Sequence, residues 1–418
     1  MTTPPTGDAK VKLTAYQWKL FGFLGVATFF EGYDFIALTQ ILPHLRADMG
    51  LDKGAAGVLL TAINVGTFVA YLVVRQADRW GRRRVLTITI VGYTIFTLLS
   101  GLAPNVWVFG AAQMMARVFL IGEWAISMVI AAEEFPADRR GLVIGVIQAF
   151  STFGAVVCAG LVPVLVSTPV GWRMVYFVGI IPLVLLAFAR RGLRESRRFE
   201  EQVADKQPTQ VPIAEELLRV FRTPYWKRTV QLGVIWFVTY VASQNAVTFW
   251  KDWAMTERGL TDSHAARLIT IGAIGAMPLV FFVGKLIDWI GRKPGSVIIF
   301  GLSSLGILGS FNAPTGILLQ LSVVFGIFAA SAALPVLNTY TTELFPTELR
   351  GSAYAWANTL IGRVGYVISP FFLGLVADDL GWGPTVSFTA IFPIVAVVLI
   401  LWWLPETRGR ELEDTSAL

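Results

Sequence analysis

The sequence predicts an all-α membrane protein with twelve transmembrane helices in two six-helix pseudo-repeats. Of the 418 residues, 55% are hydrophobic, and the mean hydropathy of +0.63 is too high for a soluble domain. Charged residues and glycines recur after a constant 210 residues, the distance from Asp78 to Asp288. The same displacement carries Gly81 and Arg82 onto Gly291 and Arg292. One constant offset indicates two structurally equivalent halves.

Apolar windows of about twenty residues, enough to cross roughly 30 Å of hydrocarbon as a helix, occur six times in each half. In the first half they cover 18–42, 55–74, 85–102, 106–132, 142–166 and 175–189. In the second half they cover 230–250, 268–286, 296–311, 317–341, 352–376 and 386–404. We therefore expect an N-terminal six-helix bundle over 1–189 and a C-terminal bundle over 229–418, which ends in a short cytoplasmic tail. A cytoplasmic linker over 190–228, partly helical near 213–220, joins them.

Lysines and arginines gather in the connections after the even-numbered spans and at both termini, which predicts cytoplasmic termini. The isoelectric point near 9.5 then follows from topology, without a nucleic-acid partner. The single Cys158 excludes a disulfide within the chain and a cysteine metal site, and we expect no metal and no cofactor. Short outer loops without glycosylation sequons favour a bacterial inner membrane.

Three loop motifs carry a family resemblance. Residues 78–84 and 284–293, each with an Asp-x-x-Gly-Arg core, resemble the loop signature of the major facilitator superfamily. Residues 133–141 and their repeat at 343–351 resemble a second signature, shared by the sugar-porter, organic-ion and metabolite symporter branches. Residues 405–409 resemble the sugar-porter tail motif. The resemblance covers the whole chain and implies a secondary transporter, not an enzyme.

The signature loops also have chemistry of their own. A carboxylate at a helix end, beside a glycine turn and arginines, can bind neighbouring helix termini and guanidinium groups. We expect such clusters to latch the cytoplasmic ends of the two halves when the outward state is populated. The predicted gating residues are Asp78, Arg82, Glu133, Arg140, Asp288, Arg292, Glu343 and Arg350. The alternative, anchoring to anionic head groups, applies best to Arg83 and Arg84.

Ionisable side chains within spans indicate transport chemistry, because a charge in hydrocarbon costs several kcal/mol unless it is paired or hydrated. Glu31 and Asp34 share one face of the first span, and Arg117 and Glu123 lie in the fourth. Both histidines fall near span ends, so the proton carrier is predicted to be a carboxylate. Burial favours its neutral form and Arg117 favours its charged form, so protonation would toggle a pair between Asp34 and Arg117. Alternatively, Arg117 is a permanent partner that fixes helix packing.

The second half has one charge at mid-span, Arg363. An unpaired guanidinium there favours an anion, and a substrate carboxylate could bind it with two hydrogen bonds. Other predicted substrate-binding residues are polar or aromatic, namely Tyr240, Gln244, Asn245, Asn338, Trp356, Asn358 and, from the fifth span, Gln148. Alternatively, the polar ones join helices and the aromatic ones pack or face lipid.

Family detail adds a substrate class. Residues 31–35 and 122–124 resemble the first and fourth spans of metabolite:proton symporters, and 361–365 with Pro370 resemble the eleventh span of aromatic-acid:proton symporters. The resemblance implies uptake of a small organic acid anion with protons, by alternating access, and we expect a monomer. The alternatives are a sugar, polyol or organic-cation carrier of the same fold, or a transporter-like sensor that does not translocate. No nucleophile-base constellation supports an enzyme.

Overall fold

The computed structural model describes residues 13–75, 77–181, 215 and 218–410. Within them the regular elements are all helices, and ten are long and apolar enough to cross a membrane. A bent pair makes an eleventh candidate span. The predicted all-α membrane fold is confirmed. The sixth window is described only as far as Ile181, and most of the expected linker over 190–228 lies outside the described residues.

The first half contributes α1 (Ala15–Met49), α2 (Lys53–Arg75), α3 (Ala77–Trp80), α4 (Arg82–Gly101), α5 (Val106–Glu134), α6 (Ala137–Val166), α7 (Arg173–Phe177) and the 3-10 turn η1 (Val178–Ile180). Helix α1 begins where Thr14 forms a capping box with Gln17. Asn105 caps α5 through the backbone N–H of Val108. Several helices extend beyond their apolar windows, because capping groups and polar residues at the ends satisfy the last turns.

The second half contributes η2 (Arg219–Arg222), α11 (Trp226–Thr248), α12 (Trp250–Thr256), α13 (Asp262–Ile290), α14 (Arg292–Asn312), α15 (Ile317–Glu343), α16 (Thr347–Tyr354), η3 (Ala355–Gly362), α17 (Arg363–Leu380), α18 (Trp382–Phe388) and α19 (Ile391–Trp403). Three windows expected as single helices are interrupted. The window 230–250 continues through a 41° bend into α12. The window 352–376 contains η3, a π-helical stretch, and 386–404 is divided between α18 and α19.

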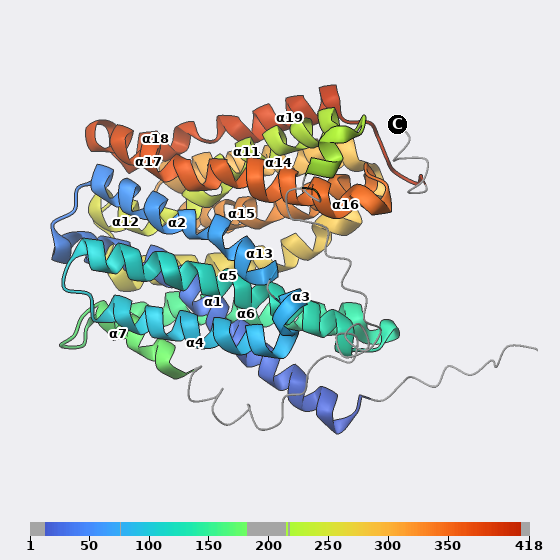
Figure 1. Ribbon diagram of the computed structural model, residues 1–418. Coiled ribbons are helices and arrows are strands. Elements are labelled where there is room, and N and C mark those ends of the chain that lie inside the picture. The colour runs from blue at the N-terminus through green and yellow to red at the C-terminus, as the bar shows by residue number, and fades with distance from the viewer. Residues whose placement is uncertain (1–12, 76, 182–214, 216–217, 411–418) are drawn as a thin grey trace, which may run out of the picture.

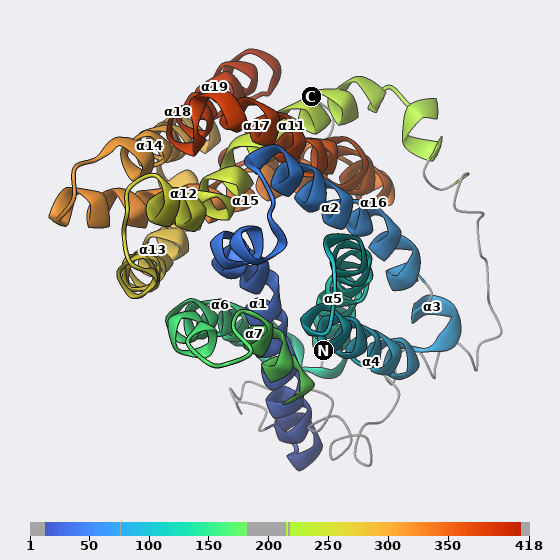
Figure 2. The ribbon, with the colours of Figure 1, turned by 90° about the vertical axis from the view of Figure 1, so that its left-hand side faces the viewer.

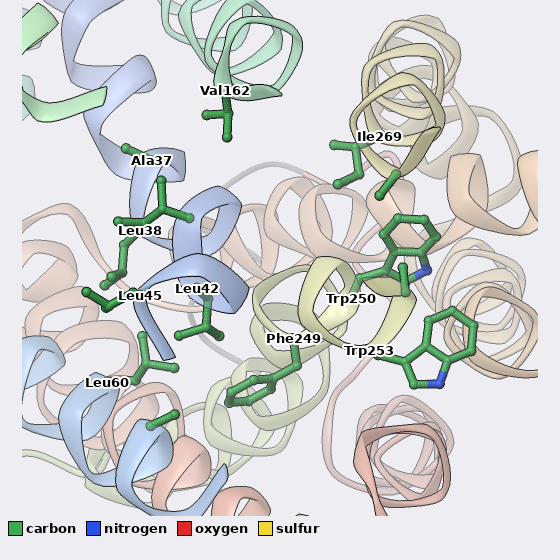
Figure 3. Packing of buried hydrophobic residues seen from close by; sticks show 14 of the residues in the cluster. Ala37, Leu38, Leu42, Leu45, Leu60, Val162, Phe249, Trp250, Trp253 and Ile269 are labelled. Atoms are coloured by element: carbon green, nitrogen blue, oxygen red, sulfur yellow. The ribbon is translucent and has the colours of Figure 1, made fainter. Parts of the chain in front are cut away.

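The two halves lie against each other along their length, with α1 and α4 to α7 toward the bottom of Figure 1 and α11 and α14 to α19 toward the top. Contacts between them involve α2 with α17, α6 with α13, and α1 with α12. We call the end where α1 finishes and α2 begins the closed end; it faces the viewer in Figure 2. A buried apolar cluster there draws on both halves, with Leu38 and Leu42 from α1 and with Phe249 and Trp250 from the bend between α11 and α12 (Figure 3).

The opposite end, which we call the signature end, carries the repeated loops. Gly81 and Gly291 begin α4 and α14 with φ of 93° and 108°, a conformation that side chains with a Cβ rarely adopt. The constant offset in the sequence is therefore also a structural repeat of two tight turns.

Candidate functional site

Glu31 is buried where α1 crosses α6. The backbones approach closely there, because a Cβ on Gly32 would lie 1.9 Å from the carbonyl oxygen of Ser151. A Cβ on Gly154 would lie at the same distance from the carbonyl oxygen of Phe29. This crossing places the Ser151 hydroxyl 2.7 Å from Glu31 Oε2, to which it donates a hydrogen bond. The two glycines thus bring a hydroxyl of α6 to a carboxylate of α1.

Asp34 and Glu123 also meet hydroxyl groups. Thr97 of α4 lies 3.5 Å from Asp34 Oδ2, and Ser127, one turn along α5, donates to Glu123 Oε1 at 2.7 Å. The remaining oxygens, Asp34 Oδ1 and Glu123 Oε2, are buried without a hydrogen-bond partner in the described part of the chain. The three carboxylates therefore share one pattern, in which a neutral hydroxyl contacts each of them.

Arg117 is buried on α5, with its guanidinium carbon 4.9 Å from the centroid of the Phe35 ring. Such cation–π contacts stabilise a charge that has lost water. Its Nη1 atom has no hydrogen-bond partner among the described residues. In this conformation Arg117 therefore rests on the aromatic neighbour of Asp34, and the ion pair expected between Arg117 and Asp34 is not among those of the described residues.

Arg363 follows η3, the π-helical stretch of its span. The flanking glycines bring this stretch against α11: a Cβ on Gly362 would lie 2.6 Å from Trp236 Cβ, and one on Gly365 would lie 2.4 Å from the carbonyl oxygen of Phe237. Single π-helical turns within α-helices occur frequently at functional sites. The Arg363 side chain is half-buried and has no hydrogen-bond or ion-pair partner among the described residues.

Aromatic and amide side chains gather on α11, η3 and α17 near this position. Asn358 Nδ2 donates to the Tyr240 hydroxyl at 3.2 Å. The Tyr240 ring stacks on Trp236 with a centroid distance of 5.4 Å and lies 6.3 Å from Tyr366. The structure thus brings together two predicted substrate-binding residues, Tyr240 and Asn358.

Other predicted binding residues have structural contacts. Asn245 Nδ2 donates to Ser369 Oγ at 2.8 Å and so joins α11 to α17. Trp356 packs edge-on against Phe221, with a centroid distance of 4.7 Å. Gln148 is exposed on α6. In this conformation Asn245 and Trp356 hold neighbouring segments, which is the helix-joining or packing alternative that the sequence left open.

Two further residues of the expected set remain less constrained. Gln244 is half-buried on α11, and Asn338 is half-buried on α15. The side-chain oxygen of Asn338 is buried without a hydrogen-bond partner in the described ranges. An amide oxygen in that state is available to a ligand that donates a hydrogen bond.

The predicted gating residues form matching clusters inside each half. In the first half Arg82 is buried and donates to Glu133 Oε1 at 3.3 Å and to the carbonyl oxygen of Ala77 at 3.2 Å. In the second half Arg292 donates to Glu343 Oε1 at 2.7 Å and to Asp288 Oδ1 at 2.8 Å. The repeat therefore reproduces an ion pair as well as a turn.

The remaining predicted gating residues are Arg350, Arg140 and Asp78. The Arg350 side chain donates to the carbonyl oxygen of Phe345 at 3.4 Å. Arg140 is half-buried, with an Nε atom that has no hydrogen-bond partner in the described part of the chain. The Asp78 side chain lies outside the described part of the structure. The role of all eight residues as a latch between the halves stays a prediction.

Glu406 is a structural residue at the signature end that our sequence reasoning did not single out. It accepts backbone N–H bonds from Arg292 and Lys293, both at 2.9 Å, at the start of α14. Burial acts to raise the pKa of Glu406, but these backbone donors hold it below its usual range. Thr407 donates to Glu343 Oε2 at 2.5 Å. In the sequence, the tail motif at 405–409 is the signal that could have identified Glu406.

Among the residues that the structure describes, no group of three or more His, Cys, Asp or Glu side chains could hold a metal ion. The sequence profile of the Major Facilitator Superfamily matches residues 24–360 and 232–417. The chain belongs to the Major Facilitator Superfamily. This facilitator is therefore a multi-pass membrane transporter and not an enzyme, as the loop motifs predicted.

Its relatives and structural neighbours agree with that assignment. The chain is 26% identical to a probable 4-methylmuconolactone transporter of Cupriavidus pinatubonensis, over 92% of this facilitator and 89% of the relative. It is 26% identical to a cis,cis-muconate transport protein of Acinetobacter baylyi, over 93% and 95% of the two chains. A bacterial homologue of the human lysosomal transporter Spinster has the same fold, with a TM-score of 0.74, 16% identity, and coverage of 93% and 97%.

Proposed function

We propose that this facilitator imports a small organic acid anion together with protons, by alternating access. Two relatives that it matches over nearly their whole length are named for muconate and for a muconolactone, so organic acids are the substrate class to test first. Alternating access requires one substrate site that is reached in turn from each side of the membrane.

The position of Arg363 is the observation that supports an organic acid as the substrate. It is half-buried at the junction between η3 and α17 and has no ion-pair partner among the described residues. A guanidinium within a span is costly unless an anion or water meets it. A carboxylate matches its planar fork with two charge-assisted hydrogen bonds, and the ring of Tyr240 and the amide of Asn358 would contact the rest of the ligand.

The buried carboxylates of the first half support proton coupling. In the described part of the chain, Glu31, Asp34 and Glu123 contact hydroxyl groups and form no ion pair. A hydroxyl can accept from the protonated acid or donate to the carboxylate, so each site accommodates either form. Arg117 lies nearby as the charge that would favour the deprotonated form.

The positive-inside pattern gives the orientation that we propose. Both termini would be cytoplasmic, so the signature end would face the cytoplasm and the closed end the outside of a bacterial inner membrane. In this conformation the carrier would then be sealed toward the outside. We further propose that the monomer is the transporting unit.

Uptake into proteoliposomes under an imposed pH gradient tests this proposal. The probes are cis,cis-muconate, an aromatic monocarboxylate such as benzoate, their amides, and xylose. We expect an acid to accumulate against its gradient when the outside is acidic, and the matching amide not to enter. Entry of the amide at the rate of the acid would replace the organic-acid proposal with a neutral-solute carrier. Equal accumulation without the pH gradient would rule out proton coupling.

A further inference from the structure

Helix α4 presents a row of polar side chains to the buried carboxylates of the first half. Thr89, Tyr93 and Thr97 are buried on this helix and lie four residues apart, so they share one face at steps of about 6 Å. Thr97 contacts Asp34 at 3.5 Å. Thr89 lies beside Gly122 of α5, where a Cβ would be 3.0 Å from its Cγ2 atom. Tyr93 is therefore placed between Asp34 and the stretch of α5 that begins at Gly122.

The Tyr93 hydroxyl is buried without a hydrogen-bond partner among the residues that the structure describes, and so are Asp34 Oδ1 and Glu123 Oε2. The carboxylates that act on the Tyr93 phenol electrostatically are Glu123, Asp34 and Glu31, in decreasing order. A hydroxyl donates one hydrogen bond and accepts others, so it can accept a proton from an acid while it gives its own to a carboxylate. Tyr93 thus has the chemistry needed to connect Glu123 with Asp34.

Two further titratable groups face the same carboxylates. Arg117 of α5 interacts electrostatically with Glu31. Tyr176 of α7 has a buried hydroxyl and interacts with Asp34 and with Arg117. A proton that moves from one carboxylate of this cluster to another therefore changes the charge that surrounds Arg117.

The second half has a small cavity where the first half places Tyr93. The cavity lies between α11, α14 and α15, and its lining includes the counterparts of three first-half residues at the offset of 210, namely Ser243 for Tyr33, Ser303 for Tyr93 and Ala333 for Glu123. The repeated fold therefore forms with small side chains at these positions. Since packing does not require a phenol and a carboxylate there, their presence in the first half favours a role in proton chemistry.

We propose that the Tyr93 hydroxyl relays a proton between Glu123 and Asp34 during transport. The protonated Glu123 carboxyl gives its proton to the Tyr93 oxygen, while the original Tyr93 proton passes to a carboxylate oxygen of Asp34. One O–H bond forms at Tyr93 as the other breaks, so the phenol is neutral before and after, and the negative charge moves from Asp34 to Glu123. The relay rests on the proton coupling proposed above, and it lies in the opposite half from Arg363.

Tyr93→Phe removes the hydroxyl and keeps the ring. Because no described residue bonds to that hydroxyl, its loss should not lower the melting temperature. In proteoliposomes, net uptake of cis,cis-muconate driven by a pH gradient should fall by about tenfold, less than the full contribution of a proton-transfer group because a conformational step also limits the parent. Exchange of internal for external muconate should keep the parent rate, since exchange needs no net proton transfer. Benzoate replaces muconate if the parent accumulates only benzoate.

Solvent deuterium separates a relay from a packing effect. Without the relay, proton transfer limits net uptake, so the ratio of the rates in H₂O and D₂O should rise above that of the parent. Tyr340→Phe is the matched control, because Tyr340 of the second half is also fully buried, with a hydroxyl that lacks a hydrogen-bond partner in the described part of the chain. It should show the net uptake and the isotope ratio of the parent.

Parent-like net uptake in Tyr93→Phe, with a parent that is coupled to protons, would overturn the relay alone, as would an equal loss in Tyr340→Phe. Slower net uptake with the parent's isotope ratio, or with an equal loss of exchange, would assign Tyr93 to packing and reject the relay. A parent whose net uptake does not respond to the pH gradient would reject the proposed coupling, and the relay with it.

Discussion

The first half buries Glu31, Asp34 and Glu123 in its spans, whereas the positions 210 residues later hold Val241, Gln244 and Ala333. At the signature end the halves instead match closely, since Arg82 with Glu133 has its counterpart in Arg292 with Glu343. The residues that repeat are those that build turns and hold helix ends. The residues that differ lie within the spans, where a transporter must distinguish a proton from a solute.

The largest expected effect comes from removing the charge chemistry of the first half. Asp34→Asn should abolish accumulation of substrate against its gradient while exchange of internal for external substrate continues, because exchange does not require release of the proton. Glu31→Gln and Glu123→Gln in the same assay rank the three carboxylates. Asp48→Asn, on the same helix but at its partly exposed end, is the control. Normal accumulation by Asp34→Asn would remove Asp34 from the coupling mechanism.

A change in the second half should alter the affinity for substrate. Arg363→Lys keeps the positive charge but loses the planar fork, so we expect acid binding to weaken by about 2 to 4 kcal/mol, or roughly 30- to 1000-fold. Calorimetry with an acid and its amide, on this variant and its parent, measures the change. Arg258→Lys, whose exposed side chain contacts the carbonyl oxygen of Ala313 at the closed end, should bind normally. If Arg363→Lys binds the acid as tightly as the parent, Arg363 does not contact the carboxylate.

Glycine substitutions give a smaller contrast between the halves. Gly32→Ala should lower the melting temperature more than Gly365→Ala, because the added Cβ would lie 1.9 Å from a carbonyl oxygen in the first case and 2.4 Å in the second. Overpacking of this kind costs about 1 to 3 kcal/mol. Gly145→Ala and Gly301→Ala meet nothing within 4 Å and should stabilise slightly, through helix propensity. Equal melting temperatures in all four variants would contradict the close crossings.

The family, the membrane class and the long helices could be predicted because hydropathy and the constant offset act over many residues. Local sequence could not predict the break at Phe249, where one span becomes α11 and α12, since no glycine or proline marks that position. The ion pair between Arg46 and Asp252 was also not predicted. Arg46 lies in the last turn of α1 and Asp252 in α12. Hydropathy does not indicate which charges meet across two halves.

The candidate site was predictable in its residue types and less so in its contacts. Glu31, Asp34 and Arg363 stand out because charge within a span is rare. Their neighbours are set by helix rotation and by glycine crossings, so Ser151 at Glu31 and Phe35 under Arg117 follow from packing that the sequence does not state. Trp356 matched the expected composition of a binding site, yet it packs on Phe221.

Glu406 has a consequence for how the protein is made. It accepts the first N–H groups of α14, although it lies more than a hundred residues later in the chain. During synthesis α14 enters the membrane before Glu406 has been added to the chain. Until then, water or lipid head groups must satisfy the backbone N–H groups at the start of that helix. The signature end of the second half can therefore mature only when translation is nearly complete. A message truncated before codon 406 would yield a chain with every long helix but with that end unfinished, a form that quality-control proteases should recognise.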